Sequence, residues 1–333
     1  MATTTPVRTI HSIINDIGFV GHSLISISDL SDDQLYGLFE LAKTLEPWNR
    51  SKIDLFPGAI LGLLFFQPST RTRMSFETAI TRLGGKALVE TNPEKTSSIA
   101  KEESLEDMMR CVCQYANVIV LRHYDDQAAR SAAAVSTSPI INGGWGHWEH
   151  PTQALLDLYA MWRTFGHIKD LTVCVAAADM VEARTGHSMA YGLARLGAKI
   201  ILASRSDRRT PPEVMAKLKD EFGVVPEEVL DSNQDSFNEL VSGVDLIYLP
   251  GCSAPKGATS DFYRTIMDDY YVRAETLEAV RNSGRDIYIT HTLPRRAGEM
   301  DLRIDDTDSQ LCFRSISHSV NIRMALVASI LGL

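Results

Sequence analysis

The stretch AILGLLFFQPSTRTRMSF, residues 59–76, decides the fold. Its first part, 59–66, is a short apolar run that predicts a strand buried inside a parallel sheet. Apolar residues then recur at helical spacing from Phe76 to Leu83, and two glycines follow, so this segment predicts a helix. Two arginines and three hydroxyl residues lie between strand and helix, within 69–73. The stretch therefore predicts a strand, a turn rich in positive charge and hydrogen-bond donors, and a helix.

Strands and helices alternate along the rest of the chain. Short apolar runs predict further strands at 86–90 and 118–122, and further buried strands at 171–177, 198–204, 244–250 and 286–290. Helical periodicity marks 30–45, 105–115 and 149–166, and the final segment, 319–333, is an apolar helix that must pack on something. This alternation is typical of α/β folds with parallel sheets. The 333 residues are enough for two cores, so the chain is expected to form two α/β halves joined near residue 150.

Composition and charge exclude several classes of protein. The chain has 33 basic and 42 acidic residues and a net charge of −9, which argues against non-specific attraction to nucleic acid or an anionic membrane. It has no apolar run as long as a membrane span and no signal-peptide pattern in residues 1–16, so we expect a cytoplasmic protein. Its five cysteines lack the spacing of a zinc site, so reduced thiols and no bound metal are expected.

The turn at 67–73 predicts an anion site. Ser69 is placed to cap the helix, and the free N–H groups of the first helical turn point beyond the end of the strand. The positive end of the helix dipole, the hydroxyls and an arginine together suit a dianionic phosphate. Because successive helical residues diverge by about 100°, we expect Arg71 to bind the anion and Arg73 to pair structurally. A capped helix start in solvent is the alternative, and this stretch alone favours neither.

The ends of other strands favour the anion site. Arg122 and His123 end one strand, His150 and Gln153 lie three apart at a helix start, and ITHTLPRR (289–296) ends the last strand. In parallel α/β sheets, ligands bind beyond the carboxyl ends of the strands. Each of these side chains alone is more often a surface charge or a core histidine. Their shared position at strand ends predicts a single binding region.

With these motifs in place, the chain resembles the aspartate/ornithine carbamoyltransferase family over nearly its full length, and its aspartate branch most. The motifs that carry the resemblance are FFQPSTRTRMSFE (65–77), SSIAKEES (97–104), VIVLRH (118–123), HPTQALLDLY (150–159), ARTGHS (183–188) and HTLPR (291–295). The first and fourth together are highly specific for carbamoyl phosphate binding. The resemblance implies an enzyme that transfers the carbamoyl group of carbamoyl phosphate to an amine and releases phosphate.

The resemblance also implies roles for individual residues. The phosphate would be held by Ser69, Thr70, Arg71 and Thr72. The carbonyl oxygen would be surrounded by Thr72, Arg122 and His150, and the carbamoyl nitrogen would contact Gln153 and the backbone carbonyls of Leu293 and Pro294. Ser97 and Lys101 would lie on a loop that reaches the neighbouring subunit's site, which implies a homotrimer. The catalytic set would be Arg71, Thr72, Lys101, Arg122 and His150.

The acceptor amine would contact a second set of residues, Arg184, Thr185, Leu293 and Arg295. A structural salt bridge is the alternative for Arg184, and an exposed surface position is the alternative for Arg295 and Arg296. The resemblance requires no metal or other cofactor. It implies a carbamoyl phosphate domain at 1–149, a Rossmann-like acceptor domain at 150–315 and a C-terminal helix at 316–333 that packs back on the first domain.

The acceptor side departs from the family's pattern. In the aspartate branch, an Arg-x-Gln pair that grips the amino acid's carboxylates follows the strand equivalent to 244–250, whereas this chain has Gly251 and Ser253. Glycine cannot replace a guanidinium that grips two oxygens. Lys256 and Arg264 are candidate replacements, although an exposed loop charge is the more common role of such residues. The chain also has a glutamine, at position 67, where the family often has glutamate.

L-Aspartate is the first expectation for the acceptor, and a different amine in a specialised pathway is the alternative. A catalytically silent relative that binds carbamoyl phosphate is a hypothesis of another class, but the near-complete set of first-domain residues argues against it. A nucleotide-binding dehydrogenase would need a Gly-x-Gly-x-x-Gly motif after 171–177, and the sequence has none there.

Overall fold

The computed structural model describes residues 9–251, 268–296 and 298–332. The described residues do not include Ser253, which stands at an expected clamp position. They also do not include the candidate replacements Lys256 and Arg264. The chain forms two compact units. Unit 1 ends at Gly146 and resumes at His318, and unit 2 spans His147–Ser317. The sequence predicts domains divided after residues 149 and 315, with one substrate bound by each of the first two. This division of roles stays a prediction.

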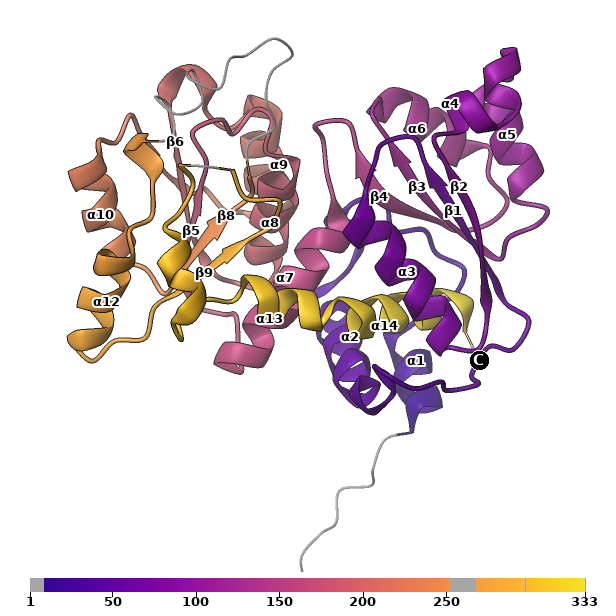
Figure 1. Ribbon diagram of the computed structural model, residues 1–333, viewed down its shortest axis with the longest axis horizontal. Helices are drawn as coiled ribbons and strands as arrows, with labels where there is room; N and C mark the ends of the chain where they lie inside the picture. The colour runs from indigo at the N-terminus through magenta and orange to yellow at the C-terminus, as the bar shows by residue number, and fades with distance from the viewer. Residues whose placement is uncertain (1–8, 252–267, 297, 333) are drawn as a thin grey trace, which may run out of the picture. The chain divides into compact units, whose positions relative to one another are not determined.

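Unit 1 is built on a four-stranded parallel sheet in the order β2-β1-β3-β4 (Figure 1). The strands are β1 (Ile60–Phe65), β2 (Lys86–Thr91), β3 (Val118–His123) and β4 (Ile140–Trp145). The apolar run that opens the deciding stretch is confirmed as β1, which is buried beyond its first residue. It pairs with β2 on one side and β3 on the other, as expected of a strand that is apolar on both faces.

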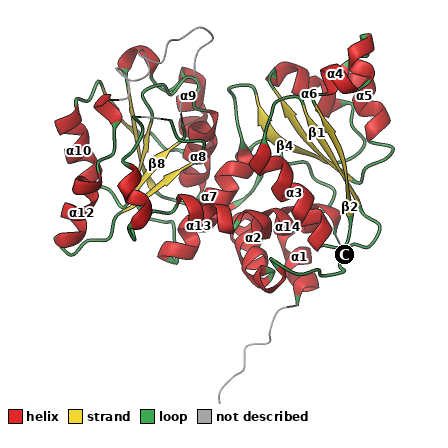
Figure 2. Cartoon of the chain, viewed as in Figure 1, coloured by secondary structure: helices red, strands yellow, loops and turns green. Residues whose placement is uncertain are grey.

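Helices flank this sheet (Figure 2). They are α1 (Ile10–Ile17), α2 (Asp32–Thr44), α3 (Thr70–Arg82), α4 (Pro93–Thr96), α5 (Leu105–Val112), α6 (Asp126–Ala134) and α14 (Ser319–Leu331). The terminal helix α14 is buried almost throughout and packs against α2 and α3. Its Arg323 lies over the ring of Phe76 on α3, 5.1 Å from the ring centroid. The expectation that the C-terminal helix returns to the first part of the chain is confirmed.

Unit 2 holds a five-stranded parallel sheet in the order β7-β6-β5-β8-β9. The strands are β5 (Thr172–Ala176), β6 (Lys199–Ser204), β7 (Glu227–Leu230), β8 (Leu246–Leu249) and β9 (Tyr288–His291). The helices are α7 (Pro151–Phe165), α8 (Arg184–Arg195), α9 (Pro212–Phe222), α10 (Gln234–Ser242), α12 (Ala274–Asn282) and α13 (Cys312–Ser317). From β5 the chain proceeds outward to β6 and β7, then returns to the other side of β5 as β8. The strand order therefore reverses between β5 and β8, and in such sheets this is where ligands bind.

Two strands do not appear among the sequence predictions. β4 has the sequence IINGGW and is buried throughout. Its two glycines interrupt the apolar run, so the sequence does not indicate a strand there. β7 begins with two glutamates and is not fully buried, as is usual for a strand at the edge of a sheet. Both units are nevertheless parallel α/β sheets, as the sequence predicts. No helix in the described part of the chain is both long and apolar enough to cross a membrane.

Candidate active site

The predicted anion site lies where β1 gives way to α3. β1 ends at Phe65 and α3 begins at Thr70, with Ser69 in the N-cap position in extended backbone conformation. The hydroxyl of Ser69 makes no capping hydrogen bond, contrary to the sequence expectation. The Ser69 side chain therefore does not occupy the N–H groups of the first helical turn. An anion can take the place of the cap and accept hydrogen bonds from them.

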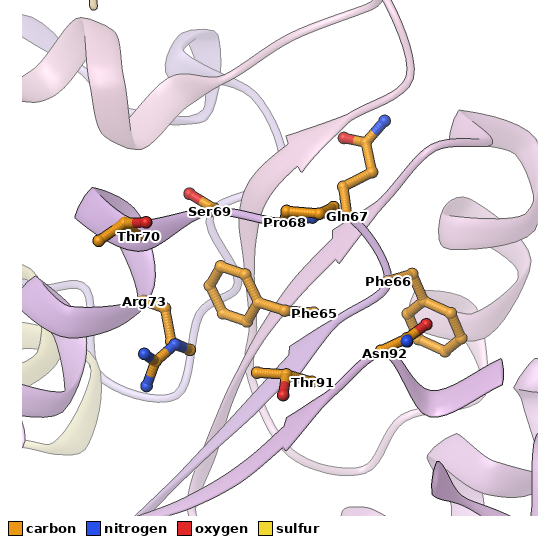
Figure 3. A pocket seen from close by; sticks show the side chains of 9 residues that line it. All are labelled: Phe65, Phe66, Gln67, Pro68, Ser69, Thr70, Arg73, Thr91 and Asn92. Carbon is orange, nitrogen blue, oxygen red and sulfur yellow. The ribbon is translucent and has the colours of Figure 1, made fainter. Parts of the chain in front are cut away.

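A cavity of about 300 Å³ opens at this turn (Figure 3). It is lined by residues 65–70, by Arg73 on α3, and by Thr91 and Asn92 at the end of β2. Ser69 and Thr70 thus line a single cavity, whereas Thr72 is buried within the helix start. Gln67 lies on the same wall. Because its side chain is neutral, this wall does not repel a phosphate.

The two arginines of the turn have different environments. Arg73 donates to Glu77 one turn further along α3, with 2.9 Å between nitrogen and oxygen, and also lines the cavity. Arg71 is exposed, although the protein around its guanidinium still lowers its pKa through desolvation. The pairing expected of Arg73 is therefore present. Phosphate binding by Arg71 stays a prediction.

Arg122 and His123 differ in role at the end of β3. Arg122 is half-buried and donates from Nη1 to the backbone carbonyl of Gly143 on the adjacent strand at 2.9 Å, which fixes its guanidinium at the end of the sheet. His123 is buried, stacks on Tyr124 and meets Phe66 edge to face, and desolvation lowers its pKa. Arg122 thus suits a ligand contact, and His123 is a core histidine.

Ser97 and Lys101 bound the short 3-10 helix η3 (Ser98–Lys101) on the surface of unit 1. Ser97 donates its hydroxyl to the carbonyl of Pro93 at 2.7 Å and accepts from the N–H of Ile99. Lys101 is exposed at the end of η3, and neither residue lines the cavity of its own chain as far as the structure describes it. A role for this loop in a neighbouring subunit stays a prediction.

In unit 2, His150 occupies the N-cap position of α7 and is buried. Its backbone N–H donates to the hydroxyl of Ser188 on α8 at 2.9 Å, and that hydroxyl donates to the buried carboxylate of Glu149 at 3.0 Å. Pro151 occupies the first helical turn, where its missing N–H has no cost. The start of α7 is therefore held by side-chain hydrogen bonds from α8, with a histidine at its tip.

Gln153, in the first turn of α7, takes part in a buried network. Its amide nitrogen donates to Asp157 Oδ2 at 3.0 Å, and the phenol of Tyr248 on β8 donates to the same oxygen at 2.9 Å. Burial and the nearby Asp157 carboxylate raise the pKa of Tyr248 well above its ordinary value, so this phenol stays a donor. Since a carboxylate only accepts, the nitrogen of the Gln153 amide must face it.

Arg184 and Thr185 open α8, just beyond the end of β5. Thr185 donates its hydroxyl to the carbonyl of Pro250 at 3.0 Å, and Thr292 donates to the same carbonyl at 2.6 Å. These bonds tie together the segments that follow β5, β8 and β9. Desolvation lowers the pKa of Arg184 to about 10, so the guanidinium stays charged at neutral pH but lies where an anion would be favoured.

The segment after β9 is held by His291. The N–H of Leu293 donates to His291 Nδ1 at 2.8 Å, so the ring proton is on Nε2, which donates to Glu299 at 2.8 Å. Leu293 has a positive φ of 56° and precedes a cis peptide bond to Pro294. The backbone conformation at Leu293 is thus held by a buried histidine and carboxylate pair, and with it the direction of the carbonyls assigned to the carbamoyl nitrogen.

Arg295 is a further acceptor candidate, and Gly251 stands where the family's clamp is expected. Arg295 binds both oxygens of Asp305, at 2.6 and 2.8 Å, and lies over the ring of Phe313. This engagement favours a structural role for Arg295 over acceptor binding. Gly251, at the expected clamp position, has a φ of 72° in the left-handed region.

Unit 2 therefore brings Arg184, Thr185 and Leu293 to the carboxyl ends of its strands. Hydrogen bonds link the backbone of His150 to α8 and the side chain of Gln153, through Asp157, to β8. Among the described residues, no group of three or more His, Cys, Asp or Glu side chains could hold a metal ion. Three buried carboxylates that hold these residues do not appear among the sequence predictions: Glu149, Asp157 and Glu299. Asp157 carried a signal, because it is a charged residue inside the apolar run LLDLY.

Two family models match the chain. The model of the aspartate/ornithine carbamoyltransferase, carbamoyl-P binding domain matches residues 22–163, and that of the Asp/Orn binding domain matches residues 169–330. Among curated relatives, a ureidoglycine carbamoyltransferase of Rubrobacter xylanophilus is 63% identical over 325 residues, covering 97% of this chain and 96% of the relative. An aspartate carbamoyltransferase catalytic subunit of Pyrobaculum calidifontis is 37% identical, covering 94% and 98%.

Solved structures agree with this picture. An aspartate transcarbamoylase from Trypanosoma cruzi, in complex with carbamoyl phosphate and aspartate, has a TM-score of 0.83 at 28% identity and covers 95% of this chain and 97% of that one. An ornithine carbamoyltransferase from Pyrococcus furiosus has a TM-score of 0.81 at 25% identity, covering 94% and 98%.

Proposed function

Since the chain belongs to the aspartate/ornithine carbamoyltransferase family and is a carbamoyltransferase, we propose that its acceptor is ureidoglycine, or a closely similar amine, rather than aspartate. The observation that carries this proposal is the 63% identity, over nearly the full length, to a protein named for ureidoglycine. The relative named for aspartate is only 37% identical. Aspartate, the first expectation from the sequence, is therefore less well supported than the alternative of another amine.

The chemistry of the acceptor fits the departure from the family's pattern. Aspartate carries two carboxylates, whereas ureidoglycine carries one carboxylate, one amine and a neutral ureido group. A second guanidinium clamp has nothing to bind in such an acceptor. The chain has Gly251 at that position and keeps Arg184, whose desolvated charge suits a single carboxylate.

The reaction needs fixed donors and no further cofactor. The acceptor amine attacks the carbamoyl carbon, charge builds on the carbonyl oxygen, the bond to phosphate breaks, and the departing phosphate takes up the proton that the amine loses. In this proposal Ser69, Thr70, Arg71 and Thr72 hold the phosphate. Thr72, Arg122 and His150 stabilise the charged oxygen, an effect to which each fixed donor contributes roughly 3 kcal/mol. Gln153 and the Leu293 and Pro294 carbonyls orient the carbamoyl nitrogen.

We further propose that Ser97 and Lys101 act in the site of a neighbouring copy within a homotrimer, where Lys101 would offset charge on the departing phosphate. Mixing the inactive variants Lys101→Ala and Arg122→Ala tests this, because a shared site regenerates some intact sites in mixed trimers. Activity that does not rise on mixing, in a sample whose mass is that of a trimer, would show that each copy works alone.

The test of the acceptor is phosphate release from carbamoyl phosphate with ureidoglycine, aspartate, ornithine and other amines supplied in turn. Release with ureidoglycine, with a product carrying two ureido groups detected by mass spectrometry and with loss of both signals in Arg71→Ala, is expected. Equal or faster release with aspartate would refute the proposed acceptor. No release with any amine would favour the silent relative.

A further inference from the structure

The start of helix α8 carries Arg184 and Thr185 but has no side-chain cap. Its N-cap residue is Ala183, whose methyl group cannot accept a hydrogen bond from the N–H groups of the first helical turn. The loop before the helix, 177–183, follows the end of β5. A contact other than a cap must therefore fix the backbone that delivers Arg184 to the end of the sheet.

His187, four residues after the N-cap, makes such a contact. It is only 3% exposed, and its Nε2 lies 2.7 Å from the carbonyl oxygen of Met180 in the loop. The same carbonyl accepts from the N–H of Ala183 at 3.4 Å, which closes a turn directly before Arg184. The imidazole thus ties the helix to the turn that precedes it, in the place of a cap.

The other ring nitrogen faces a different segment. Nδ1 of His187 lies 3.1 Å from the carbonyl oxygen of Trp148, two residues before His150. A neutral imidazole has one N–H, so it can donate to only one of the two carbonyls. Burial lowers the pKa of His187, although the surrounding carbonyls act in the opposite direction, so the neutral ring is favoured at neutral pH. The shorter contact places the proton on Nε2, facing Met180.

The segment that leads to His150 is held by a different residue of α8. The N–H of His150 donates to Ser188 Oγ at 2.9 Å, and that hydroxyl donates to the carboxylate of Glu149 at 3.0 Å. These two hydrogen bonds do not involve the imidazole. The proton of His187 therefore acts on the turn before Arg184 and not on the approach to α7.

We propose that His187 is a positioning residue for Arg184 and, through it, for binding of the acceptor. The proposal rests on the proposed function, in which Arg184 binds the carboxylate of the acceptor. Without the donor to the Met180 carbonyl, the turn 180–183 relaxes, and the guanidinium of the next residue is no longer held in one place. A two-oxygen contact tolerates little displacement, because both hydrogen bonds must form at once. His187 itself does not need to touch the substrate.

Two carboxamide variants separate the two ring nitrogens. The amide nitrogen of His187→Gln lies near the place of Nε2 and still donates to Met180, whereas that of His187→Asn lies near the place of Nδ1 and reaches Trp148 instead. His187→Gln is expected to keep the KM of ureidoglycine within about threefold of the parent value, and His187→Asn to raise it about tenfold or more. The KM of carbamoyl phosphate should stay constant in both. Each variant is the matched control of the other, because they carry the same functional group.

A double-mutant cycle tests whether the effect passes through Arg184. In an Arg184→Met background, His187→Asn is expected to raise the KM of ureidoglycine by less than about twofold, because the guanidinium that it displaces is already gone. Thermal unfolding confirms the fold of each variant. Full multiplication of the two single effects would overturn the inference, since His187 would then act on the acceptor by another route.

The same data distinguish this inference from the proposed function. If the parent protein does not use ureidoglycine, or if Arg184→Met leaves its KM unchanged, the proposed function or the role of Arg184 in it fails, and this inference with it. If Arg184→Met raises the KM but His187→Asn does not, the positioning role alone is overturned. Loss of acceptor affinity in His187→Gln with retention in His187→Asn would also overturn it, because the ring would then act through Trp148.

Discussion

Gln153 donates its amide nitrogen to Asp157 Oδ2 at 3.0 Å, one turn further along the buried helix α7. The carboxylate fixes which end of the amide faces it, so the amide oxygen of Gln153 is the end left for a substrate. An oxygen is what a carbamoyl NH₂ requires. Asp157 is therefore a positioning residue for the proposed reaction.

Asp157→Asn is expected to lower kcat by about tenfold to a hundredfold, because the new amide no longer dictates the orientation of Gln153. Steady-state kinetics with saturating substrates measure this effect. Tyr248→Phe is the matched control, since it removes the other hydrogen bond to Asp157 but leaves the bond from Gln153. Equal losses in both variants would indicate damage to the core instead of a misplaced amide.

Arg71→Ala and Arg73→Ala are expected to differ in effect. Arg71→Ala should raise the KM of carbamoyl phosphate by about a hundredfold, the effect of losing a charged contact to phosphate. Arg73→Ala breaks a partly exposed ion pair with Glu77, which should cost less than about 1 kcal/mol of stability and change KM little. Since Arg73 also lines the cavity, a larger KM effect in Arg73→Ala would reverse the two assignments.

Gly251→Arg is not expected to create aspartate carbamoyltransferase activity. The left-handed φ of 72° and the 3.3 Å approach to His291 should lower the free energy of unfolding by about 1–3 kcal/mol. Thermal unfolding and acceptor kinetics check both parts. Gly251→Ala should share the loss of stability, which separates strain at the backbone from the effect of the added charge. A stable Gly251→Arg enzyme that turns over aspartate would contradict the expectation.

Arg184→Met should separate binding from stability. Burial lowers the pKa of Arg184 to about 10, so the folded protein disfavours the charged form. This cost is fully present at neutral pH and falls only as pH rises above about 10. Removing the charge should therefore leave thermal unfolding unchanged or raise its midpoint, while the KM of the acceptor rises at least about tenfold. A sharp loss of stability with an unchanged KM would assign Arg184 to a structural salt bridge.

Much of the fold follows from local patterns. The apolar run 59–66 predicts a strand because a strand buried on both faces needs apolar residues throughout. Helical spacing and the glycines after Leu83 predict a helix and its end. The same patterns fail for β4 and β7. The glycines of β4 interrupt its apolar run, and the glutamates of β7, which a sheet edge allows, remove the apolar pattern there.

The anion site is equally local, since the turn, the helix start and its hydroxyls are neighbours in sequence. The sequence by itself therefore determined the class of fold, and it predicted an anion site at one turn of unit 1. Only the tertiary structure decided which carboxylate orients Gln153, which histidine tautomer holds Leu293, and why position 251 needs glycine. These depend on pairings such as Tyr248 with Asp157 and Glu299 with His291. Such partners meet only when strands and helices pack, and no spacing along the chain records that packing.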